Sequence, residues 1–104
     1  MKQFFKSLFS GGKNIQIKAL ISNGAMIIDV RTQAEYLNGH LKTSVNIPLA
    51  ELSGSLSKLD KSKVVITCCA TGMRSASAKN ILLTSGFSEV YNGGSWKSLQ
   101  KFES

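Results

Sequence analysis

The residues best suited to chemistry in this chain form one short run, Cys68-Cys69-Ala70-Thr71-Gly72-Met73-Arg74-Ser75. The run follows residues 64–67, a β-branched stretch that is typical of a buried strand. It leads directly into residues 75–85, whose pattern predicts a helix. The N-terminus of a helix has unpaired N–H groups and about half a positive charge, so a cysteine held there has a lowered pKa. A thiolate at this place is a candidate nucleophile that needs no histidine base.

The two cysteines are expected to play different parts. At Cys69 the end of a strand, a glycine-bearing loop, the cation Arg74 and the start of a helix coincide, which favours a reactive role. Gly72 lets the loop curl so that successive N–H groups point inward and form a nest for an anion. Cys68 still belongs to the strand, and the sequence leaves open whether it takes part or is only a small buried residue. A disulfide between the two neighbours is disfavoured by its geometry.

Composition excludes several other kinds of site. The chain has 104 residues, the length of one domain, and 42% of them are hydrophobic, enough to form a core. Two adjacent cysteines rule out a disulfide-stapled secreted scaffold and a four-ligand zinc site. A single histidine, His40, disfavours histidine-based metal centres and Ser-His-Asp triads. We expect a cytoplasmic protein, because thiols stay reduced in that compartment.

The charge is strongly positive, with 13 Lys+Arg against 6 Asp+Glu and a net charge of +7. The lysines are scattered from Lys2 to Lys101 without a nucleic-acid-binding motif, so no nucleic-acid partner is expected. We interpret the excess charge as a field that attracts small anionic substrates.

Short apolar strands alternate with helices along the chain, which predicts an open parallel α/β sheet. The pattern predicts strands at residues 26–28, 45–47, 64–67 and 90–91. Asn14 is expected to cap a helix that ends at Gly24, and Thr32 with Glu35 has the spacing of a capping box. Residues 92–94 are predicted to form a turn before a helix capped by Ser95. In such sheets ligands bind outside the carboxyl ends of the strands, which is where residues 68–75 follow.

Residues 1–13 are predicted to be an amphipathic N-terminal extension of a domain that covers residues 14–104. Phe4, Phe5, Leu8 and Phe9 fall at helical spacing, and Gly11-Gly12 is the plausible linker. We favour a helix that docks on its own domain over one that lies on a membrane surface or binds a partner. No stretch approaches the roughly 18 apolar residues of a membrane span, so no membrane association is expected.

Four separated blocks of the chain match the pattern of a known family. They are Ile27–Arg31 with Glu35-Tyr36, Gly39-His40-Leu41 through Val45–Pro48, Cys69–Ser75, and Gly93-Gly94 followed by Trp96. In this order and spacing, over roughly residues 15 to 97, the chain resembles the single-domain rhodaneses, a family of sulfurtransferases. The resemblance implies a rhodanese-like open parallel sheet of four to five strands with helices on both faces.

The resemblance also implies a reaction in which Cys69 carries the transferred sulfur. Cys69 stands three residues before Gly72, as in the family, and would accept sulfur from a small anionic donor such as thiosulfate. The resulting persulfide would pass its sulfur to a thiophilic acceptor, which is cyanide, a small thiol or a protein thiol. Inward N–H groups of the loop would hold the persulfide, and no metal or organic cofactor is needed. We expect a monomer, with a dimer as the alternative.

Two arginines near the loop, Arg74 and Arg31, have two interpretations each. Arg74 either binds the donor's anionic end or braces the loop against Asp29 or Glu35, and we favour bracing because arginine pairs readily with carboxylates. Arg31 has the same alternatives, and Asp29 is expected to be structural. Ala70 stands where many relatives have arginine, so one anion-binding charge is missing from this loop. His40 is expected to pack a turn, and Trp96 to lie near the rim of the site.

Two other functions fit parts of the sequence. Phosphatases and arsenate reductases of related loop architecture resemble one another in a Cys, five residues, Arg pattern, which this chain satisfies from Cys68 to Arg74. The position of Gly72 instead selects Cys69, from which the loop has four intervening residues. A binding domain without catalysis is the third possibility, and the intact cysteine, glycine and arginine of the loop argue against it.

Overall fold

The sheet of this protein contains four parallel strands in the order β2-β1-β3-β4. Our computed structural model describes residues 11–103, and residues 1–10 and 104 lie outside the described residues. The strands are β1 (Met26–Asp29), β2 (Val45–Asn46), β3 (Val65–Cys69) and β4 (Val90–Ser95). β1 and β3 lie side by side at the centre, with Ile28 opposite Thr67 and Asp29 opposite Cys68. The carboxyl ends of these two strands therefore bring residues 29–31 and 68–70 together.

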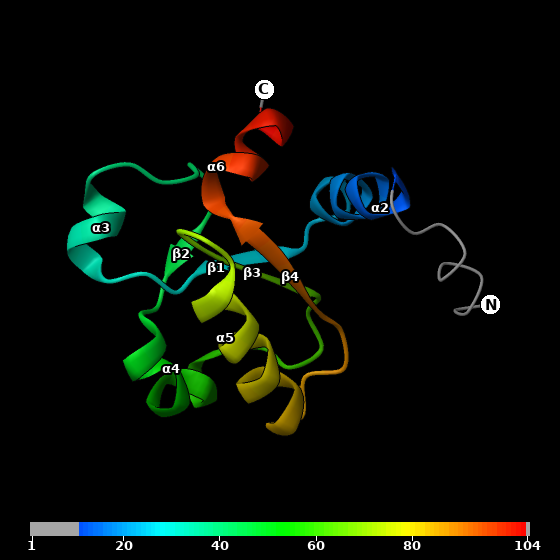
Figure 1. Cartoon of the computed structure of the whole chain (residues 1–104). Helices are drawn as coiled ribbons and strands as arrows, with labels where there is room; N and C mark the ends of the chain where they lie inside the picture. Colours follow the sequence, from blue (N-terminus) through cyan, green and yellow to red (C-terminus); the bar gives the residue numbers. More distant parts are fainter. Residues whose placement is uncertain (1–10, 104) are drawn as a thin grey trace.

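Helices cover both faces of the sheet, as predicted (Figure 1). The helices are α2 (Gly11–Ser22), α3 (Gln33–Leu37), α4 (Leu49–Ser55), α5 (Met73–Thr84) and α6 (Trp96–Leu99), with the 3-10 turns η1 (Leu56–Lys58) and η2 (Gln100–Phe102). α4 and α5 pack on one face, where Leu52 and Leu82 join the core. α2 and α6 pack on the other face, to which Ile17 and Leu99 contribute. Among the described residues, no helix has the length and apolar character needed to cross a membrane.

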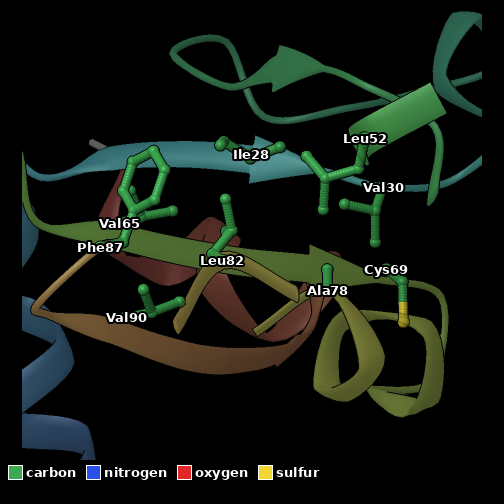
Figure 2. Packing of buried hydrophobic residues seen from close by; sticks show 9 residues of the cluster. All are labelled: Ile28, Val30, Leu52, Val65, Cys69, Ala78, Leu82, Phe87 and Val90. Carbon is green, nitrogen blue, oxygen red and sulfur yellow. The ribbon is translucent and has the colours of Figure 1, made fainter. Parts of the chain in front are cut away.

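Two hydrophobic clusters, one on each face of the sheet, form the core. The cluster under α4 and α5 contains nine buried residues, which are Ile28, Val30, Leu52, Val65, Cys69, Ala78, Leu82, Phe87 and Val90 (Figure 2). The cluster under α2 and α6 contains Ile17, Ile27, Leu41, Ile66, Cys68 and Leu99. Because side chains of a strand alternate between its faces, Cys68 and Cys69 belong to different clusters.

The predicted elements are found with shifted ends. α2 begins at Gly11 and ends at Ser22, so the expected start at Asn14 is wrong and Gly11-Gly12 lies in a helix where a linker was expected. The predicted amphipathic residues 4–9 lie outside the described residues. β3 runs through Cys69, and α5 begins at Met73, two residues before the expected start. β4 continues to Ser95, so the turn expected at residues 92–94 is wrong.

Local capping explains why the short helices form where they do. The Thr32 side chain accepts from the N–H of Glu35, and the Glu35 carboxylate accepts from the N–H of Thr32, which confirms the capping box. Ser95 caps α6 as expected, because its hydroxyl accepts from the N–H of Lys97. Both caps lie beside the carboxyl ends of strands, so they fix the helices that border the predicted site.

Candidate active site

Cys69 lies at the end of β3, on the face that α5 covers. Figure 2 shows it next to Ala78, at the end of the cluster farthest from Phe87. Gly72 forms the N-cap of α5 with a φ of +103°, a left-handed conformation that favours glycine. This turn folds the loop back over the sulfur, so that the first residues of α5 face Cys69.

The Cys69 sulfur accepts hydrogen bonds from the loop and from the first turn of α5. The N–H of Gly72 lies 3.0 Å from Sγ and the N–H of Ser75 lies 3.4 Å from it. Sγ also lies 3.6 Å from the Ser75 hydroxyl oxygen, to which the thiol donates and from which the thiolate accepts. Burial of the residue works against the charged form, but the hydrogen bonds from Ser75, Gly72 and Thr71 outweigh it and lower the pKa of Cys69. The site therefore stabilises a thiolate, and the dipole of the 12-residue α5 acts in the same direction.

Cys68 has the opposite environment, although it is equally buried. Its side chain lies among the apolar residues under α2 and α6, in the cluster with Ile66 and Leu99. Burial, together with the charge of Asp29, raises the pKa of Cys68 to about 12. Cys68 is therefore a neutral thiol. Because the thiolate is the nucleophilic form of cysteine, this disfavours a phosphatase that uses Cys68 as its nucleophile.

Asn92 of β4 joins the loop to the sheet, a role that the sequence did not predict, since Asn92 was expected only to form part of a turn. Its Oδ1 accepts from the Ser75 hydroxyl at 2.6 Å and from the N–H of Gly94 at 2.8 Å. Its Nδ2 donates to the carbonyl of Gly72 at 3.2 Å. If the amide were flipped, its Nδ2 donor would face the N–H of Gly94 and its Oδ1 acceptor would face the carbonyl of Gly72. These two contacts therefore fix the orientation of the amide. Asn92 thus holds both Ser75 and Gly72, the residues that contact the Cys69 sulfur.

Arg31 and Asp29 form a buried ion pair at the end of β1. The guanidinium of Arg31 contacts both oxygens of Asp29, at 2.9 Å from Nε to Oδ1 and 2.7 Å from Nη2 to Oδ2. Arg31 also donates to the carbonyls of Glu35 and Gly39 and stacks on Trp96, with its guanidinium carbon 4.6 Å from the ring centre. The donors of Arg31 are therefore largely engaged in holding the loop that follows β1, and the structural role expected of Asp29 fits this pairing.

Arg74 pairs with Glu35 across the site. Nη1 of Arg74 lies 2.7 Å from Oε1 of Glu35, and Nη2 lies 3.0 Å from Oε2. Hydrogen bonding with Arg74, joined by the bonds from Thr32, lowers the pKa of Glu35 to about 2, so this carboxylate is charged at neutral pH. The geometry is that of the bracing interpretation, with Glu35 rather than Asp29 as the partner.

A cavity of about 360 Å³ lies beside the loop and opens to solvent. Its lining is Arg31, Glu35, Asn38, Ala70, Trp96 and Lys97. Ala70 directly follows Cys69, so the cavity reaches the residue next to the proposed nucleophile. Trp96 lines this cavity, near the rim of the site as expected. Lys97 could not be singled out from the sequence, because it is one lysine among eleven.

Three other residues of the loop lie at the surface of the protein. Ala70, Thr71 and Met73 are exposed, and Met73 leaves 77% of its surface accessible. His40 packs a turn, as expected. Its ring stacks on that of Tyr36 with ring centres 3.8 Å apart, and its Nδ1 is hydrogen-bonded to the Tyr36 carbonyl.

In the part of the chain that the structure describes, no group of His, Cys, Asp or Glu side chains is arranged to hold a metal ion.

Comparison with known proteins identifies the family of this chain. Residues 14–101 match the family model of the rhodanese-like domain. The chain is 32% identical over 77 residues to the thiosulfate sulfurtransferase GlpE of Pseudomonas savastanoi, covering 74% of this chain and 73% of the relative. It is 35% identical over 74 residues to the thiosulfate sulfurtransferase PspE of Escherichia coli, covering 69% and 71%.

A solved structure described as a rhodanese with anions from E. coli superposes on this chain with a TM-score of 0.67. It is 34% identical and covers 71% of this chain and 89% of its own. These matches confirm the rhodanese-like α/β fold and the expectation of an enzyme. The chain belongs to the rhodanese-like family of sulfurtransferases.

Proposed function

We propose that this protein transfers a sulfane sulfur from a small anionic donor, such as thiosulfate, through a persulfide on Cys69. The observation that carries the proposal is the set of hydrogen-bond donors around the Cys69 sulfur, at 3.0 Å from the N–H of Gly72 and 3.4 Å from that of Ser75. These donors favour the thiolate without a histidine, and His40 packs on Tyr36 instead. Relatives named thiosulfate sulfurtransferase support the same class of reaction.

In the first step, the Cys69 thiolate attacks the outer sulfur of thiosulfate. A bond forms between Sγ and that sulfur, and the sulfur–sulfur bond of thiosulfate breaks. Sulfite leaves with the electron pair, so the cysteine persulfide keeps one negative charge and no external oxidant or reductant is needed. The loop N–H groups that stabilise the thiolate then stabilise the persulfide anion, in the manner of an oxyanion hole.

In the second step, a thiophilic acceptor attacks the outer sulfur of the persulfide. The sulfur–sulfur bond of the persulfide breaks, and Cys69 leaves as the thiolate that starts the cycle. A thiol acceptor becomes a persulfide, and cyanide becomes thiocyanate. Because Cys69 returns as a stabilised thiolate, its lowered pKa also makes it a good leaving group in this step.

The other residues of the site position the loop. Gly72 and Ser75 donate to sulfur, Arg74 braces the loop through Glu35, and Arg31 with Asp29 holds the neighbouring turn. Ala70, Thr71 and Met73 form the exposed rim that a donor or a protein thiol meets first. We propose that residues 14–104 form the catalytic domain. Two free cysteines in one chain fit a reducing compartment such as the cytoplasm.

Intact-mass measurement after treatment with thiosulfate tests the proposal. The wild-type chain is expected to gain the mass of one sulfur atom, and cyanide is expected to remove it with release of thiocyanate. The Cys69→Ser variant should gain nothing. Sulfur uptake by Cys69→Ser, or a requirement for Cys68 as nucleophile, would contradict the assignment.

A further inference from the structure

Two of the three charged residues that line the cavity beside Ala70 are paired with oppositely charged residues outside its lining. The Arg31 guanidinium is paired with Asp29, whose side chain is fully buried. The Glu35 carboxylate is paired with Arg74 at 2.7 and 3.0 Å. These two ion pairs are the ones present among the side chains that the structure describes, those of residues 16–103. Each contributes no net charge, so neither pair explains why an anion would enter the cavity.

Lys97 is the remaining charged residue of the lining. It lies in α6, and no carboxylate of the described residues is within 4.0 Å of its ammonium group. Its Nζ lies 5.9 Å from the centre of the Trp96 ring, and its side chain is exposed. An exposed ammonium without a carboxylate partner gives the cavity its net positive charge.

The backbone that carries the Lys97 side chain is held in place by its neighbours. The Ser95 hydroxyl accepts from the N–H of Lys97 at 3.2 Å, which fixes the start of α6. Trp96, the preceding residue, stacks on Arg31, and a Cβ added at Gly39 would meet its ring at 3.2 Å. The Trp96 ring is therefore wedged between Arg31 and the Gly39 turn, and Lys97 projects from a rigid support beside the cavity.

We propose that Lys97 is the residue that binds the anionic end of the sulfur donor. This inference rests on the proposed sulfurtransferase function and assigns its donor site to the cavity between Ala70 and Lys97. The ligand class is a sulfane-sulfur compound with an oxyanion group, such as the sulfonate end of thiosulfate. Ala70 has no charge of its own, so the Lys97 cation of the same cavity supplies the attraction.

The charge balance of the reaction predicts which kinetic constant depends on Lys97. Thiosulfate and the leaving sulfite both carry two negative charges, so Lys97 attracts the donor and the product through the same group. An interaction that is equal in the ground state and the transition state changes KM and leaves kcat nearly the same. The affinity for sulfite as a product inhibitor should weaken together with that for thiosulfate.

Lys101 provides a matched control for the experiment. It is an exposed lysine in η2, a few residues from Lys97, and its Nζ also lies near an aromatic ring, 5.3 Å from the centre of Phe102. It does not line the cavity. Replacing either lysine by alanine removes the same charge from the whole protein, so a difference between the two variants reports on position.

The test is steady-state kinetics of Lys97→Ala, Lys97→Arg and Lys101→Ala with thiosulfate at low ionic strength. We expect Lys97→Ala to raise KM for thiosulfate and the inhibition constant of sulfite about fivefold, with little change in kcat. Lys97→Arg should restore both constants, and Lys101→Ala should match wild type. The increase in Lys97→Ala should shrink as salt rises.

An unchanged KM in Lys97→Ala would overturn the inference, provided that wild type still takes up sulfur on Cys69. An equal increase in Lys101→Ala would also overturn it, because the overall positive field would then suffice. A wild-type chain that gains no sulfur from saturating thiosulfate would instead overturn the proposed function itself. Mass measurement on the same samples separates these outcomes.

Discussion

Cys68 and Cys69 are neighbours in β3, and both are fully buried. They differ in the side chains packed around them and in the hydrogen-bond donors that reach the sulfur. Cys68 packs among apolar side chains under α2 and α6, which raises its pKa to about 12. Cys69 points to the other face, where the N–H groups of Gly72 and Ser75 lie within 3.4 Å of its sulfur and its pKa is lowered. Burial alone therefore says little about the reactivity of a cysteine. The difference arises from the alternation of a strand and from the helix that begins over one face only.

The largest expected effect comes from replacing each of the two cysteines by serine in turn. Cys69→Ser should lower sulfurtransferase turnover with thiosulfate and cyanide by at least about a thousandfold, because no other thiolate is available at the loop. Cys68→Ser should retain most of the turnover per folded molecule. Thiocyanate formation measures both variants, and circular dichroism checks that each is folded. Strong loss in Cys68→Ser together with retained activity in Cys69→Ser would reverse the comparison.

The hydrogen bonds to Cys69 are tested by removing the Ser75 hydroxyl. Ser75→Ala should raise the pKa of Cys69, because the hydroxyl bond that favours the thiolate is lost. Alkylation of the thiol should then be slower than in wild type at pH values below both pKa values and equal to wild type well above them. The pH dependence of the iodoacetamide rate, measured in a Cys68→Ala background, gives the pKa.

Ser77 provides the control for this measurement, because it is an exposed serine of the same helix. Ser77→Ala should leave the alkylation profile unchanged. If Ser75→Ala and Ser77→Ala have the same profile, the hydroxyl does not stabilise the thiolate.

A smaller effect should separate bracing by Arg74 from direct donor binding. Arg74→Ala leaves the Glu35 carboxylate unpaired in the cavity, so KM for thiosulfate should rise between about twofold and fivefold. The double variant Arg74→Ala with Glu35→Gln removes that charge and should bring KM back towards wild type. Direct binding by Arg74 predicts the same high KM in the single and double variants.

The last effect is on stability rather than activity, and it follows from the raised pKa of Cys68. A thiol with a pKa of about 12 in the folded state and an ordinary value of 9.0 stays neutral in the protein when it would ionise in the unfolded chain. Its contribution to stability is complete below pH 9 and falls by about 1.4 kcal/mol per pH unit between pH 9 and 12.

Cys68→Ala should therefore cost about 1–2 kcal/mol at neutral pH, through loss of the buried sulfur, and less as the pH rises above 9. Urea unfolding of wild type and variant at a series of pH values measures the difference, in which other titrating groups cancel. A difference that stays constant up to pH 11 would contradict the raised pKa.

The parallel sheet and the loop could be predicted from the sequence because they depend on local patterns, whereas the helices on both faces were implied by the family resemblance. The β-branched stretch before Cys68 predicts a strand, and the capping box of Thr32 and Glu35 predicts the start of a helix; both are found as β3 and α3. Position along β3 also favoured Cys69 over Cys68 before the structure showed that they face opposite sides.

Other features depend on contacts between distant segments and could not be predicted in this way. Asn92 reads as a turn residue from its two following glycines, but close packing of β4 on β3 extends the strand through them. A Cβ at Gly93 would lie 2.8 Å from the Ile66 side chain and 3.0 Å from the Thr67 carbonyl, so only glycine fits there. The partner of Arg74 and the place of Lys97 in the cavity likewise depend on tertiary structure.

The most direct test of the central claim is the mass of the protein after brief treatment with thiosulfate, compared between Cys68→Ser and Cys69→Ser. We expect Cys68→Ser to gain one sulfur atom, as wild type does, and to lose it again to cyanide. Cys69→Ser should gain none. A sulfur atom carried by Cys69→Ser, and absent from Cys68→Ser, would show that the reactive cysteine is the one buried under α2 and α6.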